Sequence, residues 1–136
     1  YLLLVAGGVG IAPFVRLLNE LLENDNDETR VRLLYCVRKG SDILFKELLA
    51  QWAQHWNVKI VIFGPDVEKT SIHYLFGHVA ERLNEDHFRE QLRALCGDNL
   101  DRAAVGVCGR LTLEKDVVNF ATRAGIEHSN IRRFLA

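Results

Sequence analysis

Residues 2–14 read LLLVAGGVGIAPF, and this stretch decides the fold. Its first part, Leu2 to Ala6, is a continuous apolar run bounded by glycine, which is typical of a strand covered on both faces of a parallel sheet. After the glycines, apolar residues recur with the spacing of one helical face: Phe14, Leu17, Leu18, Leu21 and Leu22. Pro13 stands in the first turn of that helix, where proline is tolerated. The stretch therefore predicts a strand, a glycine turn and a helix.

The alternation of strand and helix continues along the chain. Further strands are predicted at Val31 to Cys36, Lys59 to Phe63, Ala104 to Cys108 and Ile131 to Leu135, with a short extended piece around Gly77 to Val79. Such alternation implies right-handed crossovers, so we expect an α/β fold: a doubly wound open parallel sheet of about five strands with helices on both faces. Ligands of such sheets bind beyond the carboxyl ends of the strands.

Three further helices are predicted from capping residues and apolar spacing. Ser41 is expected to cap a helix whose apolar positions are Leu44, Leu48, Leu49, Trp52 and Trp56. Asn84 is expected to cap a helix that runs to about Leu95. A third apolar face begins at Leu113 and should end at Gly125. The charge-rich run from Glu23 to Glu28 is expected to close the first helix and form a solvated loop.

The composition excludes several classes of function. The 136 residues make one domain, at roughly 100–200 residues per domain. Seventeen Lys and Arg against eighteen Asp and Glu offer no basic footprint for nucleic acid and no polybasic lipid anchor. The longest apolar stretch, Leu2 to Leu18, contains three glycines, a proline and Arg16, so no membrane span is expected. Three cysteines, an odd number, favour an intracellular, reducing compartment.

Neither a metal site nor a catalytic triad is predicted. The five histidines show no metal-ligand spacing, and no Cys-x-x-Cys is present. The sequence also contains no methionine and opens inside an apolar run at Tyr1. We therefore expect the chain to be a domain excised from a longer protein.

The glycine turn is where chemistry is expected. Glycine permits a positive φ and a close approach of backbone to a ligand, and the helix behind it offers free N–H groups to a pyrophosphate. Pro13 stands where a G-x-G-x-x-G fingerprint would have its third glycine, and a tight turn without a ligand is the alternative. We expect Gly8 and Gly10 to contact phosphates. A β-branched residue at Gly10 would then intrude on the pyrophosphate or forbid the backbone angle.

Four segments in order carry a resemblance to a known family. They are Leu3 to Pro13, Leu33 to Arg38 followed by Asp42 to Leu48, Gly77 to Val79 before the Asn84 helix, and Val105 to Gly109. Together they resemble the pyridine-nucleotide domain of the ferredoxin–NADP reductase superfamily. The Asp42-Ile43-Leu44 segment and the ending Phe134-Leu135-Ala136 are most similar to NADH–cytochrome b5 reductases, including forms fused to a cytochrome domain.

The resemblance implies a function shared with a second domain. Residues 1–136 would be the NAD(P)-binding domain of a flavoprotein whose flavin-binding β-barrel is missing here, so this chain alone would be inactive. It would bind NADH or NADPH and present the nicotinamide for hydride transfer to FAD on its own flavin-binding domain. Electrons would pass on to a one-electron acceptor such as a haem protein. The alternative is a degenerate nucleotide-binding or protein-interaction domain without redox activity. Two departures motivate it: Arg110 where the family usually has proline, and Arg132 where many members have glutamate. Leu113, where the family has a methionine, is a third departure.

The resemblance also implies the site residues. The cofactor-binding set is Gly7, Gly8, Val9, Gly10, Ile11, Ala12, Pro13, Arg38, Asp66, Cys108, Gly109 and Phe134. Cys108 would position the nicotinamide, since the cofactors carry the chemistry; the alternative is a small buried apolar residue. Cys36 and Cys96 are expected to pack as small hydrophobes.

Cofactor choice depends on charges after two strands. Asp66 follows the third strand. The resemblance implies that a carboxylate near this place favours NADH, because it would accept hydrogen bonds from ribose hydroxyls and repel a 2′-phosphate. The alternative is a turn aspartate after Gly64-Pro65. Arg38 and Lys39 would favour NADPH instead, because cations there could hold its 2′-phosphate. The alternative is that these two residues form a solvated loop face. We favour NADH.

Overall fold

The computed structural model describes residues 1–135 and shows one parallel sheet of six strands in the order β4-β3-β2-β1-β5-β6. The strands are β1 Leu2–Gly7, β2 Val31–Cys36, β3 Val58–Phe63, β4 Gly77–Val79, β5 Ala104–Cys108 and β6 Ile131–Arg133. The predicted α/β class is confirmed. The sheet has six strands rather than about five, because the short piece around Gly77 pairs with β3 as an edge strand.

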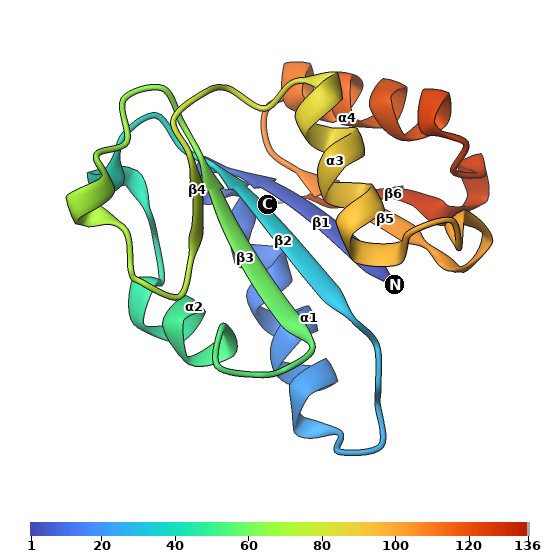
Figure 1. The fold of residues 1–136 in the computed structure, drawn as a ribbon, viewed down its shortest axis with the longest axis horizontal. Coiled ribbons are helices and arrows are strands. Elements are labelled where there is room, and N and C mark those ends of the chain that lie inside the picture. The colour runs from blue at the N-terminus through green and yellow to red at the C-terminus, as the bar shows by residue number, and fades with distance from the viewer. Residues whose placement is uncertain (136) are drawn as a thin grey trace.

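Helices cover both faces of the sheet, as Figure 1 shows. They are α1 Ala12–Glu23, α2 Lys46–Trp52, α3 Glu85–Cys96 and α4 Leu111–Ala124. Short 3₁₀ turns are η1 Gly8–Ile11, η2 Gly40–Asp42, η3 Lys69–Ser71, η4 Leu100–Arg102 and η5 His128–Asn130. Helices α1 and α2 lie on one face, and α3 and α4 lie on the other.

Two hydrophobic cores follow from the alternation of side chains along each strand. On β1, Leu4 and Ala6 pack with Phe14 and α2, whereas Leu3 and Val5 pack with α3 and α4. Leu3, Leu4, Val5 and Ala6 have no exposed surface. The prediction that the continuous apolar run forms a strand covered on both faces is therefore confirmed.

Local signals at helix ends are confirmed. The Asn84 side chain accepts a hydrogen bond from the backbone N–H of His87 at 2.8 Å and so caps α3. Gly125 ends α4 in the left-handed region with φ 101°. Pro13 lies in the first turn of α1, and that helix ends at Glu23, before the exposed acidic loop.

The helix predicted after Ser41 is wrong in both its start and its length. Ser41 lies in η2, and α2 begins only at Lys46, behind Phe45 in the left-handed region at φ 58°. The backbone N–H of Leu44 donates to the Tyr35 hydroxyl, which holds this segment extended. Leu44 and Trp56, expected on the helix face, lie outside α2 and are 39% and 71% exposed.

Strand β1 lies inside the sheet, and the later strands are added on both sides of it. Strands β2, β3 and β4 lie on one side of β1, and β5 and β6 lie on the other. Within residues 1–135, none of the helices combines the length and apolarity needed to cross a membrane.

Candidate functional site

The strand order changes direction between β1 and β5. Ligands of open α/β sheets bind outside the carboxyl ends of the strands at such a point, and we call this place the β1–β5 crevice. The register pairs Ala6 with Cys108 and Gly7 with Cys36. Turn η1 follows the end of β1, and Gly109 follows the end of β5, at this point. The structure thus brings the predicted glycine turn and the predicted Cys108-Gly109 pair to one edge of the sheet.

Gly8 and Gly10 are glycines for different physical reasons. Gly8 has φ +55°, is exposed, and a Cβ there would meet no atom within 4 Å. Gly10 is buried and its φ is not positive, but a Cβ there would lie 2.2 Å from the carbonyl oxygen of Cys108. Of the two reasons expected for Gly10, a forbidding backbone angle is therefore wrong, and intrusion on a pyrophosphate stays a prediction. Contact with the end of β5 excludes a side chain at Gly10.

A second pair of glycines lines the crevice. A Cβ on Gly109 would lie 3.4 Å from the backbone nitrogen of Gly7 and 2.8 Å from Cδ2 of Leu113. A Cβ on Gly7 would also lie 2.8 Å from the same Leu113 atom. The Leu113 side chain, at the start of α4, therefore covers both glycines. The sequence predicts Leu113 on the apolar face of this helix and shows it as a departure from the family pattern, but does not predict it as a residue of the site.

Sequence reasoning missed Tyr35, which joins two loops of this edge. The Tyr35 hydroxyl donates to the carbonyl oxygen of Gly8 at 2.8 Å and accepts from the backbone N–H of Leu44 at 3.3 Å. The side chain is fully buried, and burial raises the pKa of the phenol above its ordinary value. The sequence around Tyr35 does not predict this role, because the two hydrogen-bond partners of the hydroxyl, Gly8 and Leu44, lie on other segments.

The side chains of the other predicted site residues range from fully buried to exposed. Ile11 is fully buried in the core beside α1, so only its backbone faces the edge. Val9 is 68% exposed. Phe134 packs edge-on against Phe14, with ring centroids 5.1 Å apart. Its ring also occupies the space that a Cβ on Gly106 would take, 2.9 Å away.

Cys108 is 1% exposed in the core that α1 and α2 cover. Burial, with a smaller contribution from the Glu114 carboxylate, raises the pKa of its thiol. Burial likewise raises the pKa of Cys36 to about 12. Both thiols are therefore protonated at neutral pH, which fits positioning or packing and not nucleophilic attack.

The charged candidates meet at the ends of β2 and β3. Lys39 and Asp66 form an isolated parallel β-bridge, which places the two loops side by side. Arg38, Lys39 and Asp66 are exposed. Across the described part of the chain, these three side chains make no ion pair with one another. Their charges are thus available to a ligand at this end of the edge.

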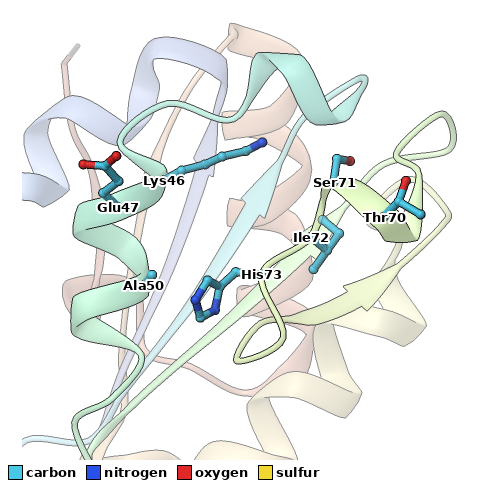
Figure 2. Close-up of a pocket in the computed structure, with 7 residues that line it drawn as sticks. All are labelled: Lys46, Glu47, Ala50, Thr70, Ser71, Ile72 and His73. Carbon is cyan, nitrogen blue, oxygen red and sulfur yellow. The ribbon is translucent and has the colours of Figure 1, made fainter.

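A hollow of about 480 Å³ lies between α2 and the loop before β4. Figure 2 shows Lys46 extending from α2 toward the segment from Thr70 to His73, and Glu47 and Ala50 on the same helix also line the hollow. None of the sequence-predicted site residues lines this hollow. No group of three or more His, Cys, Asp or Glu side chains that could hold a metal ion gathers within residues 1–135.

Curated proteins similar in sequence to this chain are reductases by description. A human protein described as "NADH-cytochrome b5 reductase-like" is 31% identical over 126 residues, covering 92% of this chain and 39% of the relative. A nitrate reductase [NAD(P)H] of Betula pendula is 31% identical, covering 90% of this chain and 14% of the relative. The chain thus spans less than half the length of these curated relatives.

Solved structures share the fold. The CS-b5R domains of human Ncb5or in the NAD⁺ form superpose with a TM-score of 0.79 at 20% identity, over 98% of this chain and 36% of that one. The cytochrome b5 reductase domain of Ulva prolifera nitrate reductase gives 0.77 at 22% identity, over 98% and 48%. Both curated relatives are described as reductases. The family model of the oxidoreductase NAD-binding domain matches residues 4–119, and the chain belongs to that family.

Proposed function

We propose that this chain is the nicotinamide-nucleotide half of a flavin-dependent reductase. It binds NADH across the β1–β5 crevice and presents the nicotinamide to FAD on a separate flavin-binding domain, from which electrons pass to a one-electron acceptor such as a haem protein. The observation that carries this proposal is Gly8. Its exposed, left-handed backbone leaves open the space in front of the loop in a chain of the NAD-binding family.

The residues at the edge fit a dinucleotide in three ways. The Gly8 to Ile11 turn offers backbone N–H groups and an unobstructed surface to a pyrophosphate. Gly109 and Cys108 end β5 beside it, where the nicotinamide end reaches the crevice. Bound NADH supplies the hydride, and the buried, protonated Cys108 limits the shape of the crevice without exchanging a proton.

Apolar side chains around this edge support docking of the flavin-binding domain. Five exposed large hydrophobic residues follow the ends of β1, β2, β5 and β6: Val9, Leu44, Phe45, Leu111 and Leu135. Exposed apolar side chains gathered at one edge are typical of interaction surfaces. A flavin domain seated there would exclude water from the nicotinamide.

Two further features support the finer parts of the proposal. Asp66 stands beside Lys39 at the far end of the edge, where its carboxylate can accept hydrogen bonds from ribose hydroxyls and disfavour a 2′-phosphate. The three cysteines are free thiols, which supports a reducing compartment.

The test is an NMR titration of the 136-residue chain with NADH. The purified chain should be colourless, should bind NADH and should fail to oxidise it. Stoichiometric flavin in the purified chain, or no response to NADH at millimolar concentration, contradicts the proposal.

A pair of glycine variants adds a matched control. Gly8→Ala and Gly97→Ala both place a Cβ in open space at nearly the same φ, +55° and +57°. Each should lower the free energy of unfolding by about 1 kcal/mol or more, because a residue with a Cβ disfavours a positive φ. Only Gly8→Ala should weaken NADH binding, since Gly97 ends α3.

A further inference from the structure

Tyr35 connects the glycine turn to the segment that follows β2. Its ring has no exposed surface, and its hydroxyl donates to the carbonyl oxygen of Gly8 at 2.8 Å. The same hydroxyl accepts from the backbone N–H of Leu44 at 3.3 Å. A hydroxyl can donate once and accept as well, so one buried atom holds both loops.

The bond to Gly8 fixes the direction of the next backbone N–H. The peptide that joins Gly8 to Val9 is planar and trans, so its C=O and N–H point in opposite directions. Tyr35 holds the carbonyl oxygen toward the buried side of the loop. The N–H of Val9 is therefore turned away from the interior, on a residue that is 68% exposed.

The restraint matters because Gly8 is conformationally permissive. With φ +55° and no neighbour within 4 Å of its missing Cβ, Gly8 has no packing contact on that side to hold its backbone. The N–H groups of the first turn have no acceptor within the helix, so the Val9 N–H is available to an anion once its direction is fixed.

We propose that Tyr35 is a positioning residue for the pyrophosphate of the bound nucleotide: it holds the Gly8 carbonyl inward so that the Val9 N–H faces the phosphate oxygens. The inference rests on the proposed function, since it assigns the pyrophosphate to the glycine turn. Tyr35 itself does not touch the ligand.

The variant Tyr35→Phe removes the hydroxyl and keeps the ring. The affinity for NADH, measured by NMR titration, should fall about three- to tenfold, the range for one hydrogen bond. The control Tyr74→Phe removes a hydroxyl from a tyrosine that is 86% exposed and should bind NADH like the wild type.

A second control separates positioning from general stability. Val58→Ala truncates a buried residue at the amino end of β3, across the sheet from the glycine turn. It should lower the unfolding temperature and leave the NADH affinity unchanged. If Val58→Ala weakens binding as much as Tyr35→Phe, the effect of Tyr35 is structural and the inference is overturned.

A measurement on the wild type does not depend on how any variant folds. Inorganic pyrophosphate and NADH should both shift the amide resonance of Val9 strongly. An unmoved Val9 amide in a chain that binds NADH overturns the inference and leaves the proposed function standing, as does wild-type affinity in a folded Tyr35→Phe. A wild type that binds neither probe overturns the proposed function and this inference with it.

Discussion

At the β1–β5 crevice the ends of the two strands pack closely against each other and beneath Leu113, whereas at the ends of β2 and β3 charged side chains stand in solvent. Gly10 lies against the carbonyl of Cys108, and Gly7 lies against Gly109. Arg38 and Asp66, by contrast, are exposed. The packed end should therefore respond to substitution by losing stability. The open end should respond by changing its choice of ligand.

The largest effect is expected for Gly10→Ala. A Cβ there would lie 2.2 Å from the backbone oxygen of Cys108, so β1 and β5 must shift apart. The free energy of unfolding should fall by about 3 kcal/mol or more, as for an overpacked core. Chemical denaturation measures it, with Gly8→Ala in the same turn as the milder control. An unchanged denaturation midpoint for Gly10→Ala would show that the crevice is not tightly packed.

Leu113→Ala tests the same end with a smaller change. The side chain covers Gly7 and Gly109, and its loss should cost roughly 1–2 kcal/mol of stability, less than for a fully buried leucine. Leu111→Ala is the matched control, because Leu111 begins the same helix and is 59% exposed. Thermal unfolding of the two variants compares them. Equal losses would mean that Leu113 does not pack into the crevice.

The fold was predictable where its signals are local. A glycine turn after an apolar run, the Asn84 cap and the Gly125 stop depend on residues within a few positions of one another. The Ser41 cap failed because two distant contacts decide that segment. Leu44 bonds to the Tyr35 hydroxyl, and a Cβ on Gly40 would collide with Ser71.

The reason for Gly10 was likewise beyond local reasoning, since its neighbour Cys108 lies on another strand. At the open end, Asp66 and Lys39 could be named from the sequence, and the structure adds that they are neighbours. Their effect on ligand choice depends on the contacts they make with the bound nucleotide, which residue spacing does not determine.

Asp66→Ala tests the open end. If its carboxylate disfavours a 2′-phosphate, the variant should gain about tenfold in NADPH affinity, or about 1.4 kcal/mol, with a modest loss for NADH. Stability should stay within about 0.5 kcal/mol of the wild type, as for other exposed positions. Asp25→Ala, an exposed residue in the loop after α1, makes the same change in net charge and should leave both affinities unchanged. If both affinities stay unchanged in Asp66→Ala, Asp66 is only a turn residue and Arg38 becomes the next candidate.

The last prediction concerns Cys36, on the strand between the two ends, and its effect appears only at high pH. Its thiol pKa is raised by burial from 9.0 to about 12, so the folded chain holds a proton that the unfolded chain releases. The stabilising contribution is complete below pH 9 and is lost as the pH rises toward 12. The free energy of unfolding should fall across that window with a slope of at most about 1.4 kcal/mol per pH unit from this group.

Denaturant titrations at several pH values measure this slope. Cys36→Ala should make it shallower, and Cys96 and Cys108, whose pKa values burial also raises, should account for part of what remains. An identical slope in Cys36→Ala would mean that this thiol is not protected by the fold.

The position of β1 in the sheet has a consequence for how the protein is made. One edge of β1 pairs with β2 soon after it in the chain, but the other edge pairs with β5, which begins at Ala104. During synthesis at roughly 5–20 residues per second, that second edge waits on the order of ten seconds for its partner. A central, wholly apolar strand with an open edge is a template for pairing with other chains. The newly made domain is therefore exposed to aggregation until β5 inserts, and its folding rate should be limited by this long-range closure.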